Sequence, residues 1–368
     1  MNGVGRYCMD RAILKFHNAI KSDATRKLYD RNLNYFLKFV NIKEAGGLLQ
    51  LKDVALQEMI EDYVIWNKDR GLRTSSINGR VVPLELFMAM NDRVLNFKKI
   101  KKMYPARVKS LGGKAWTTKE IQSMLKFTVS RRNIAIILVL ASSGVRIGGL
   151  VGLKLKHLTN IENCKAVLVY ADGIEEYTTF FSPEATVAVQ DYLNERVRCG
   201  EYLTPDTPLF RTAFRVGSAK VKGMSLGAFQ MCLREIVHKV RGVGYGRRTD
   251  TPLMHGFRKF FNTNLKNNRE INPSIAEKMM GHFNKTIPLD TFYHIVTNDV
   301  LFTEYKKAIL DLTIDDSERL KIQNKLKDEK IQSLETAKDK VIAKQARDIK
   351  TLMESVEGIW ELLGDEQG

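Results

Sequence analysis

Residues 143–150 of the chain read SGVRIGGL and place Arg146 directly after a glycine turn. The preceding residues 134–141 form the longest uninterrupted apolar run, which predicts a helix over 132–142 at the centre of a core. Apolar residues follow the arginine as well. Because core residues hold the chain on both sides of Arg146, we expect its guanidinium to occupy a fixed position.

Further motifs follow this arginine along the chain. The stretch HGFR at 255–258 sets His255 and Arg258 three residues apart, on one face of a predicted helix start that favours anions. A short predicted helix then ends in a glycine followed by His282, and Tyr293 presents a phenol before another helix. Each motif alone is common at helix ends and in surface ion pairs. Their order along one chain therefore carries more information than any single motif.

The charge of the chain indicates a polyanionic partner. Its 368 residues include 59 Lys and Arg against 42 Asp and Glu, which leaves a net charge of +17. This excess is larger than solubility alone requires. Nucleic acid is the favoured partner because each neutralised phosphate releases counterions, while a membrane surface and simple solubilisation are the alternatives.

Several classes of protein are excluded by composition. The run 134–141 is far shorter than the roughly 20 apolar residues that a bilayer span needs. The first twenty residues lack the apolar stretch and cleavage site of a secretion signal. Cys8, Cys164, Cys199 and Cys232 contain no CxxC pair, which argues against a zinc site and a disulfide framework. We expect a cytoplasmic protein without a metal.

The pattern divides the chain into four segments. Residues 1–97 carry apolar stripes at helical spacing over 11–20, 25–40, 54–66 and 75–90, and Pro83 is expected to kink or split the last of these helices. Residues 98–115 resemble a basic linker suited to lie along DNA. Its candidate phosphate contacts are Lys98, Lys99, Lys101, Lys102, Arg107 and Lys109.

Residues 116–313 predict a mainly helical domain with a small β-sheet. Thr117 or Thr118 can cap a helix that carries Glu120 in its first turn. The segments 166–171 and 177–182, separated by a turn with Asp-Gly, predict a β-hairpin. Further helices are expected over 183–199, 225–240, 252–267 and 273–280.

Residues 314–368 predict one long amphipathic helix, since the stretch is rich in Lys, Glu, Asp and Gln and has no Pro. Two of its heptad columns are interrupted. Lys327 breaks the column of Leu320, Leu334 and Val341, and Lys338 and Gln345 break that of Ile331, Leu352 and Ile359. Coiled-coil self-association and docking onto another surface are equally compatible with this pattern.

Arg146, then His255 and Arg258, then Gly281-His282, then Tyr293 resemble the signature of the tyrosine recombinases, or phage-type integrases. The resemblance covers residues 10–312. It implies an all-helical core-binding domain and an α+β catalytic domain. Phrases such as EYTTF at 176–180 and EYKKAI at 304–309 look most like the archaeal branch.

The resemblance also implies a reaction and roles. Arg146 and Arg258 would stabilise the negative charge of a phosphorane, and His282 would donate a hydrogen bond to the scissile phosphate. Tyr293 would attack and form a 3′-phosphotyrosine, with His255 taking its proton. No cofactor or metal is implied. The partners would be duplex DNA attachment sites of a mobile element, bound by four protomers.

Two positions depart from the family pattern. The family has an acidic residue three positions after the first arginine, where this chain has Gly149. It also has a lysine in the hairpin turn as general acid, and the turn here, ADGIEE at 171–176, has none. Lys165 is the nearest alternative, and Lys154 and Lys220 are others.

Other interpretations stay open. Tyr305 is the rival nucleophile, but its surroundings are typical of an amphipathic helix face, so we favour Tyr293. A catalytically inactive descendant that only binds DNA would explain both departures. A relaxing enzyme similar to type IB topoisomerases shares the chemistry and would lack strand exchange between two DNA sites.

Overall fold

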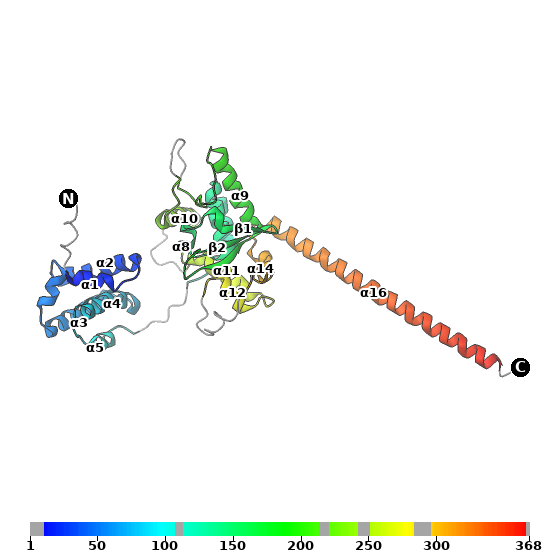
Figure 1. The fold of residues 1–368 in the computed structure, drawn as a ribbon, viewed down its shortest axis with the longest axis horizontal. Helices are drawn as coiled ribbons and strands as arrows, with labels where there is room; N and C mark the ends of the chain where they lie inside the picture. Colours follow the sequence, from blue (N-terminus) through cyan, green and yellow to red (C-terminus); the bar gives the residue numbers. More distant parts are fainter. Residues whose placement is uncertain (1–10, 107–112, 213–220, 242–250, 283–295, 366–368) are drawn as a thin grey trace. The chain divides into compact units, whose positions relative to one another are not determined.

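The computed structural model describes residues 11–106, 113–212, 221–241, 251–282 and 296–365, with side chains up to residue 356. The chain forms two compact units, residues 1–111 and 112–368, and each is described by itself. Figure 1 shows the first as a group of helices and the second as helices around a small sheet, followed by one long helix. The predicted class, mainly α with a small β-sheet, is confirmed.

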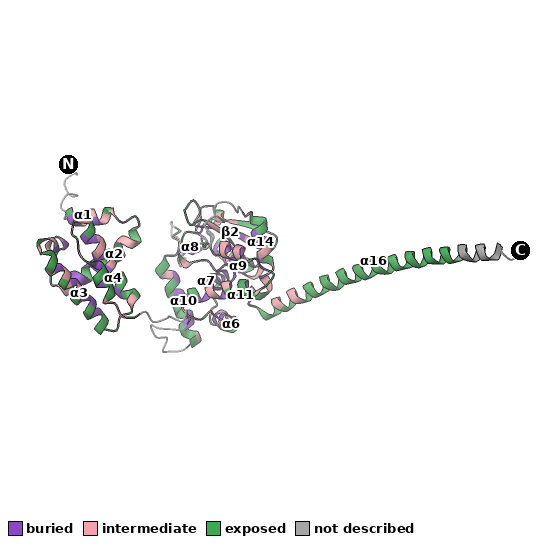
Figure 2. Ribbon diagram, turned by 90° about the horizontal axis from the view of Figure 1, so that it is seen from below, coloured by how far each residue is buried: buried purple, intermediate pink, exposed green. Residues whose placement is uncertain are grey.

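The first unit is entirely helical within its described residues. Its elements are α1 (Arg11–Asn18), α2 (Asp23–Phe39), the 3₁₀ turn η1 (Ala45–Gln50), α3 (Asp53–Asp69), α4 (Thr74–Met90) and α5 (Phe97–Lys102). The predicted apolar stripes face inward: Phe36, Tyr63 and Phe87 are fully buried. Burial of these stripes drives the packing, and Figure 2 shows the buried faces turned toward one another.

Pro83 lies inside α4 without splitting it, contrary to one of the two outcomes that the sequence predicts. Proline has no N–H, so the carbonyl of Gly79, one turn earlier, loses its partner in the helix. The side-chain amide of Asn32 in α2 donates to this carbonyl at 3.0 Å. A contact between two helices therefore replaces the missing backbone hydrogen bond.

The segment predicted as a basic linker begins instead with α5. Phe97 and Ile100 are buried in the core of the first unit, so the helix is a part of that unit. Lys99 forms an ion pair with Glu61 at 2.8 Å and Lys101 one with Glu85 at 2.7 Å. The predicted domain boundary after residue 97 is therefore too early.

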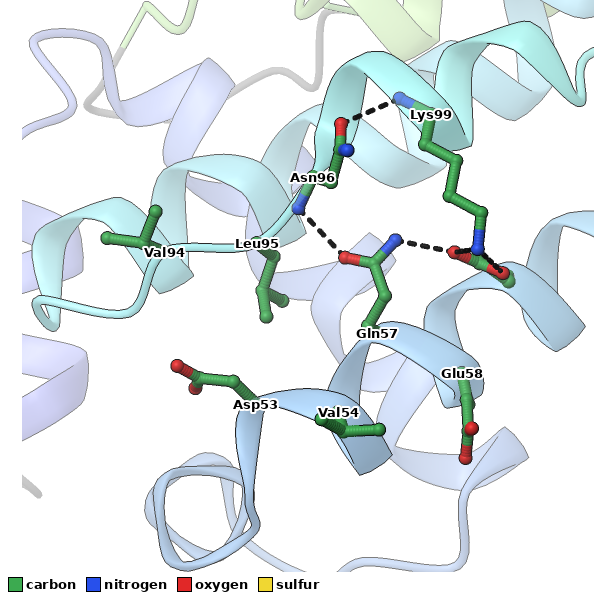
Figure 3. Close-up of a pocket in the computed structure, with 9 residues that line it drawn as sticks. Asp53, Val54, Gln57, Glu58, Val94, Leu95, Asn96 and Lys99 are labelled. Atoms are coloured by element: carbon green, nitrogen blue, oxygen red, sulfur yellow. Dashed lines mark hydrogen bonds and ion pairs between the residues drawn. The ribbon is translucent and has the colours of Figure 1, made fainter.

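A pocket of about 300 Å³ lies between α3 and the start of α5. Figure 3 shows Gln57 at its centre, where its side-chain oxygen accepts from the backbone N–H of Asn96 at 2.8 Å. Asn96 in turn caps α5 by accepting from the N–H of Lys99 at 2.9 Å. These bonds fix α5 on α3.

The second unit surrounds a three-stranded antiparallel sheet of order β1-β2-β3. The strands are β1 (Leu158–Ile161), β2 (Cys164–Val169) and β3 (Tyr177–Phe181), preceded by the short turn η2 (Leu155–His157). β2 and β3 form the predicted hairpin, whereas β1 was not predicted. Only four residues long and partly exposed, β1 has no alternating pattern strong enough to stand out.

The helices of the second unit are α6 to α12 and α14 to α16. Their bounds are α6 (Thr118–Lys126), α7 (Arg131–Ser143), α8 (Ile147–Val151), α9 (Pro183–Arg198), α10 (Leu226–Arg241), α11 (His255–Asn267), α12 (Pro273–Met279), α14 (Asn298–Lys306), α15 (Ile309–Leu312) and α16 (Asp316–Asp365). Thr117 caps α6 in a capping box with Glu120, as predicted. α7 is buried along 135–143 and packs on α9, α11 and β3, which makes it the central element.

The predicted C-terminal helix is confirmed as α16, a single helix of 50 residues. The chain just before it is tied to the second unit. The Glu184 carboxylate accepts from the N–H groups of Ile314 at 2.8 Å and Asp315 at 3.0 Å, and Gln122 donates to the Ile314 carbonyl at 2.8 Å. No described helix is long and apolar enough to cross a membrane.

A buried ion cluster closes the end of α9. Arg196 and Arg211 bind the two carboxylate oxygens of Glu201 at 2.5 and 2.6 Å, and all three side chains are at most 4% exposed. Burial raises the pKa of Glu201, but the hydrogen bonds from both arginines lower it by more than burial raises it. The pKa of Glu201 is therefore below its ordinary value. The carboxylate therefore stays charged inside the protein.

We predict that Glu201→Gln lowers the free energy of unfolding by about 3–5 kcal/mol, because it removes the buried carboxylate charge that two buried guanidiniums bind. Urea unfolding of the full chain measures the change. Glu195→Gln is the matched control, since this glutamate of α9 is 46% exposed and 4.0 Å from Arg131. Equal losses in both variants would contradict the prediction.

The same cluster predicts a pH dependence. A carboxylate whose pKa is lowered by folding stabilises the protein above its unfolded pKa of about 4.3, and this contribution disappears as the pH falls through the folded pKa. The difference in stability between wild type and Glu201→Gln should accordingly shrink below about pH 4.

Candidate functional site

Arg258 lies in the first turn of α11 and is 8% exposed. Its guanidinium donates to the carbonyl of Gly144 at 2.6 Å and to that of Met280. These carbonyls end α7 and α12, and the negative ends of two helix dipoles therefore meet one cation. Burial lowers the pKa of Arg258. Even so, an arginine stays protonated at neutral pH.

Arg146 approaches the same turn from the other side. It precedes α8, and both of its terminal nitrogens contact the carbonyl of Gly281 at 3.4 Å. Hydrogen bonds of this length are weak. The guanidinium of Arg146 thus lies close to that of Arg258, but its hydrogen bonds to the Gly281 carbonyl are weak. The structure brings together the two arginines that the sequence motifs predicted.

Two glycines in the left-handed conformation make this convergence possible. Gly144 has φ +57° and Gly281 has φ +60°. A Cβ on Gly281 would lie 2.4 Å from the ring of Tyr177, and one on Gly144 would lie 2.3 Å from that of Phe261. Glycine is therefore needed at both positions for conformation and for space.

His282 joins the cluster at the end of α12. Its Nε2 is 2.9 Å from a terminal nitrogen of Arg258, and its Nδ1 is 2.5 Å from the Glu277 carboxylate. Because a guanidinium only donates, Nε2 accepts and Nδ1 carries the proton in this arrangement. Glu277 also forms an ion pair with Lys266. The imidazole is therefore oriented from both sides.

Glu277 is charged in this setting. Burial raises the pKa of Glu277, but the hydrogen bonds from Lys266 and His282 lower it by more than burial raises it. The pKa of Glu277 is therefore below its ordinary value. The motif analysis did not identify this residue. Its only sequence signal is its position five residues before His282, on a helix that ends in glycine.

Two tyrosines from the hairpin lie beside the arginines. Tyr170 has φ +55°, an uncommon conformation for a non-glycine residue, and its ring centroid is 6.3 Å from that of Tyr177. The Tyr177 hydroxyl is buried without a hydrogen-bond partner of good geometry among the described residues. Burial raises the pKa of both phenols, and the nearby Arg146 and Arg258 partly offset this. Both phenols therefore stay protonated at neutral pH.

Gly149 has no room for the acidic residue that the family pattern expects. A Cβ here would be 2.6 Å from Val169 and 3.0 Å from Val145, and Tyr170 lies 3.6 Å away. The side chains of Val169, Val145 and Tyr170 occupy this space. The departure at Gly149 is thus part of a local arrangement that includes Tyr170.

The other predicted residues that the structure describes form none of the hydrogen bonds named above within the cluster. His255 is exposed at the first position of α11. Lys165 donates to Asn160 at 2.7 Å, and burial lowers its pKa. It lies five residues along the chain from Tyr170, or about 17 Å of strand, so it does not join the cluster. Lys154 forms an ion pair with Asp206 at 3.0 Å.

Several predicted residues fall outside the described part of the chain. These are the predicted nucleophile Tyr293, the alternative lysine Lys220, and Arg107 and Lys109 of the basic segment. Lys98, Lys99, Lys101 and Lys102 are exposed on α5. No group of acidic, His and Cys side chains suited to a metal occurs among the described residues.

Tyr305, the rival nucleophile, is a core residue. It is 0% exposed, its hydroxyl donates to the Ser142 carbonyl at 2.8 Å, and its ring packs 5.1 Å from that of Phe180. Burial raises the pKa of this phenol well above its ordinary value. Such a hydroxyl cannot reach a phosphate without unpacking α14.

Comparisons with known proteins concern the family and the fold of the chain. The phage integrase family model matches residues 114–297, which is half of the chain. A comparison with the curated proteins gave no match. Among solved structures, the Tn1549 transposon integrase with a circular intermediate DNA is 18% identical and has a TM-score of 0.55, covering 80% of this chain and 97% of its own.

A second structure of the same integrase, with transposon right end DNA, is 17% identical and has a TM-score of 0.52. It covers 80% of this chain and 98% of its own. At these identities the likeness concerns the fold. The second unit has the fold of a tyrosine recombinase catalytic domain.

We predict that Gly149→Asp destabilises the protein by about 1–3 kcal/mol, because its Cβ overlaps two valines that the sheet and α7 hold in place. Thermal unfolding of the full chain measures the loss. Gly148→Ala is the matched control, since a Cβ there meets only the Tyr170 hydroxyl at 3.3 Å. An aspartate tolerated without loss would contradict the packing argument.

Proposed function

The chain belongs to the phage integrase family, and from this premise we propose that it is a site-specific recombinase that cuts and rejoins duplex DNA through a 3′-phosphotyrosine, integrating or excising a mobile element. The observation that carries the proposal is the convergence of Arg146, Arg258 and His282 on the 280–282 turn. We also propose, from the sequence, that the chain belongs to the archaeal branch of this family.

The two arginines suit the transition state of phosphodiester cleavage. Attack on phosphorus adds negative charge to the non-bridging oxygens, and fixed guanidiniums stabilise that charge where it develops. Arg258 is bound to backbone carbonyls, so no carboxylate competes with phosphate for it among its described contacts. Arg146 would give up two weak 3.4 Å contacts to the Gly281 carbonyl when it binds phosphate, and breaking them costs little free energy.

The nucleophile in this proposal is Tyr293. Its phenolic oxygen forms a bond to phosphorus while His255 takes the proton, and the bond from phosphorus to the 5′-oxygen breaks. The 5′-oxygen leaves as a hydroxyl by taking a proton from solvent water, since the hairpin turn has no lysine to supply one. A 5′-hydroxyl from another strand reverses these steps, which rejoins DNA without an external energy source.

His282 would contribute a hydrogen bond to the scissile phosphate. In the present arrangement its Nε2 accepts from Arg258. In the proposed reaction, a ring with a proton on both nitrogens donates from Nε2 to the phosphate, and the Glu277 carboxylate beside Nδ1 stabilises that cation. Glu277 is therefore proposed as a positioning residue.

The proposed partner is duplex DNA at attachment sites, bound by a tetramer of the chain. The exposed Lys98 and Lys102 are candidate phosphate contacts, whereas Lys99 and Lys101 are engaged by Glu61 and Glu85. We retain no role for Lys165, given its place at the far end of β2. The hairpin turn has no lysine, and this favours the alternative of a protein that binds DNA without cutting it.

We predict that wild-type protein forms a covalent complex with a nicked duplex that carries its attachment site, and that Tyr293→Phe abolishes it. The nick traps the intermediate because the cleaved end diffuses away. A denaturing gel, run after incubation in a chelating buffer, resolves the complex.

Tyr305→Phe is the matched control for this assay. It should retain the covalent complex while losing about 1 kcal/mol of stability with the hydrogen bond to Ser142. A complex that persists in Tyr293→Phe would refute the assigned nucleophile. Intact DNA binding without any complex would favour the binding-only alternative.

We also predict that Glu277→Gln slows cleavage by about 10- to 100-fold with DNA affinity unchanged, since it removes about 1.5–3 kcal/mol of charge-assisted hydrogen bonding that orients His282. Single-turnover cleavage and a binding titration separate the two effects. Glu304→Gln is the control, because this glutamate pairs with Lys307 at 2.6 Å on α14 and does not contact the cluster residues. Equal slowing in both variants would indicate a general loss of stability.

A further inference from the structure

The distal part of α16 carries an exposed apolar stripe. Ile342, Ile349, Met353 and Val356 are between 50% and 59% exposed, and Ala346 is exposed between them. Figure 2 shows this part of the helix without any buried residue. Side chains of this size are rarely left in water in a row, so the stripe indicates a contact surface.

The spacing of the stripe is that of a coiled coil. Its members follow one another at intervals of four, three, four and three residues, and the sequence continues the pattern with Trp360 and Leu363. An alternation of this kind averages 3.5 residues and keeps one seam on one side of the helix. The pattern starts at Ile342, because Glu335 and Asp339 occupy the preceding seam positions. It differs from the interrupted columns through Leu320 and Ile331.

The charges around the stripe are distributed unequally. Residues 338–350 contain five basic and two acidic side chains, whereas residues 351–365 contain four acidic and no basic ones. A second copy aligned in parallel would place like charges side by side. An antiparallel copy places the basic half of each helix against the acidic half of the other, which is the complementary arrangement.

We propose that a second copy of this chain binds α16 in antiparallel orientation along 342–363. The seam then pairs Ile349 with Met353 and Ala346 with Val356 of the second copy, and the register sets position 342 opposite position 360. A parallel seam would instead face Ala346 with itself and leave space unfilled. In this register, position 350 of one copy and position 357 of the other share one flank of the seam, and the two-fold axis repeats this Lys–Glu combination on the same flank. The partner that covers the apolar stripe is therefore α16 of a second copy.

Hydrogen bonds at the start of α16 fix this helix to the residues that precede it, so a contact at its far end connects two second units through their helices. Asp315 accepts from the N–H groups of Ser317 and Glu318 at 2.8 and 3.0 Å and caps the helix, and Arg319 donates to the Thr313 carbonyl at 2.6 Å. The pairing is centred near residue 351, about 35 residues from Asp316. At about 1.5 Å per residue, the two helix bases would be about 105 Å apart.

The test is the molar mass of the full chain in solution without DNA, measured by light scattering after size exclusion. Wild type should give twice the chain mass of 42.0 kDa at micromolar concentration, and the double variant Ile349→Lys/Met353→Lys should give the single mass. Leu326→Lys is the matched control, since Leu326 is 50% exposed on α16 but outside the stripe, and it should remain a dimer. Circular dichroism verifies that the variants keep their helix content.

Orientation is tested by disulfide crosslinking in a Cys8→Ser/Cys199→Ser background. Proteins with Ala346→Cys and Val356→Cys, mixed and allowed to exchange, should crosslink with each other and not with themselves. A monomeric wild type, a double lysine variant that stays dimeric, or Ala346→Cys crosslinking to itself would each overturn the proposal. DNA is absent throughout, so a failure here is distinct from a failure of the recombinase assay.

Discussion

The site depends on one buried cation. Arg258 is enclosed by α7, α11 and α12, and its charge is balanced by the carbonyls of Gly144 and Met280 rather than by a carboxylate. Burying a charge is costly unless it is paired and hydrogen-bonded, and two helix ends supply that compensation. Since these carbonyls are neutral groups, the guanidinium keeps a full positive charge, as the proposed contact with phosphate requires. The rest of the cluster is arranged around this residue.

Local patterns in the sequence predicted much of this. The apolar run before Gly144 and the HGFR motif placed both arginines on well-defined helix ends, because helix caps and periodicity depend on neighbouring residues. The amphipathic helix predicted around Tyr305 is confirmed as α14, in which Tyr305 is a buried residue. The roles of Tyr293 and His255 stay predictions.

What the sequence could not predict depends on contacts between distant residues. Asn32 keeps α4 intact at Pro83 across 47 residues of chain, and no local pattern signals such a bond. The extent of the first unit was missed because only Phe97 and Ile100 mark α5 as a core helix among its lysines. Val169 and Val145 fill the space beside Gly149, and Tyr170 next to them has a left-handed backbone conformation that tyrosine seldom adopts.

The tethered base of α16 has a consequence for how copies of the chain meet. Glu184 and Gln122 hold the residues before the helix, so whatever its far end binds is carried with the second unit. A partner confined within about 100 Å corresponds to an effective concentration on the order of 0.1–1 mM. In the proposed dimer, the paired helices keep the two second units about 105 Å apart, so each unit has a second one within that reach without a search through bulk solution.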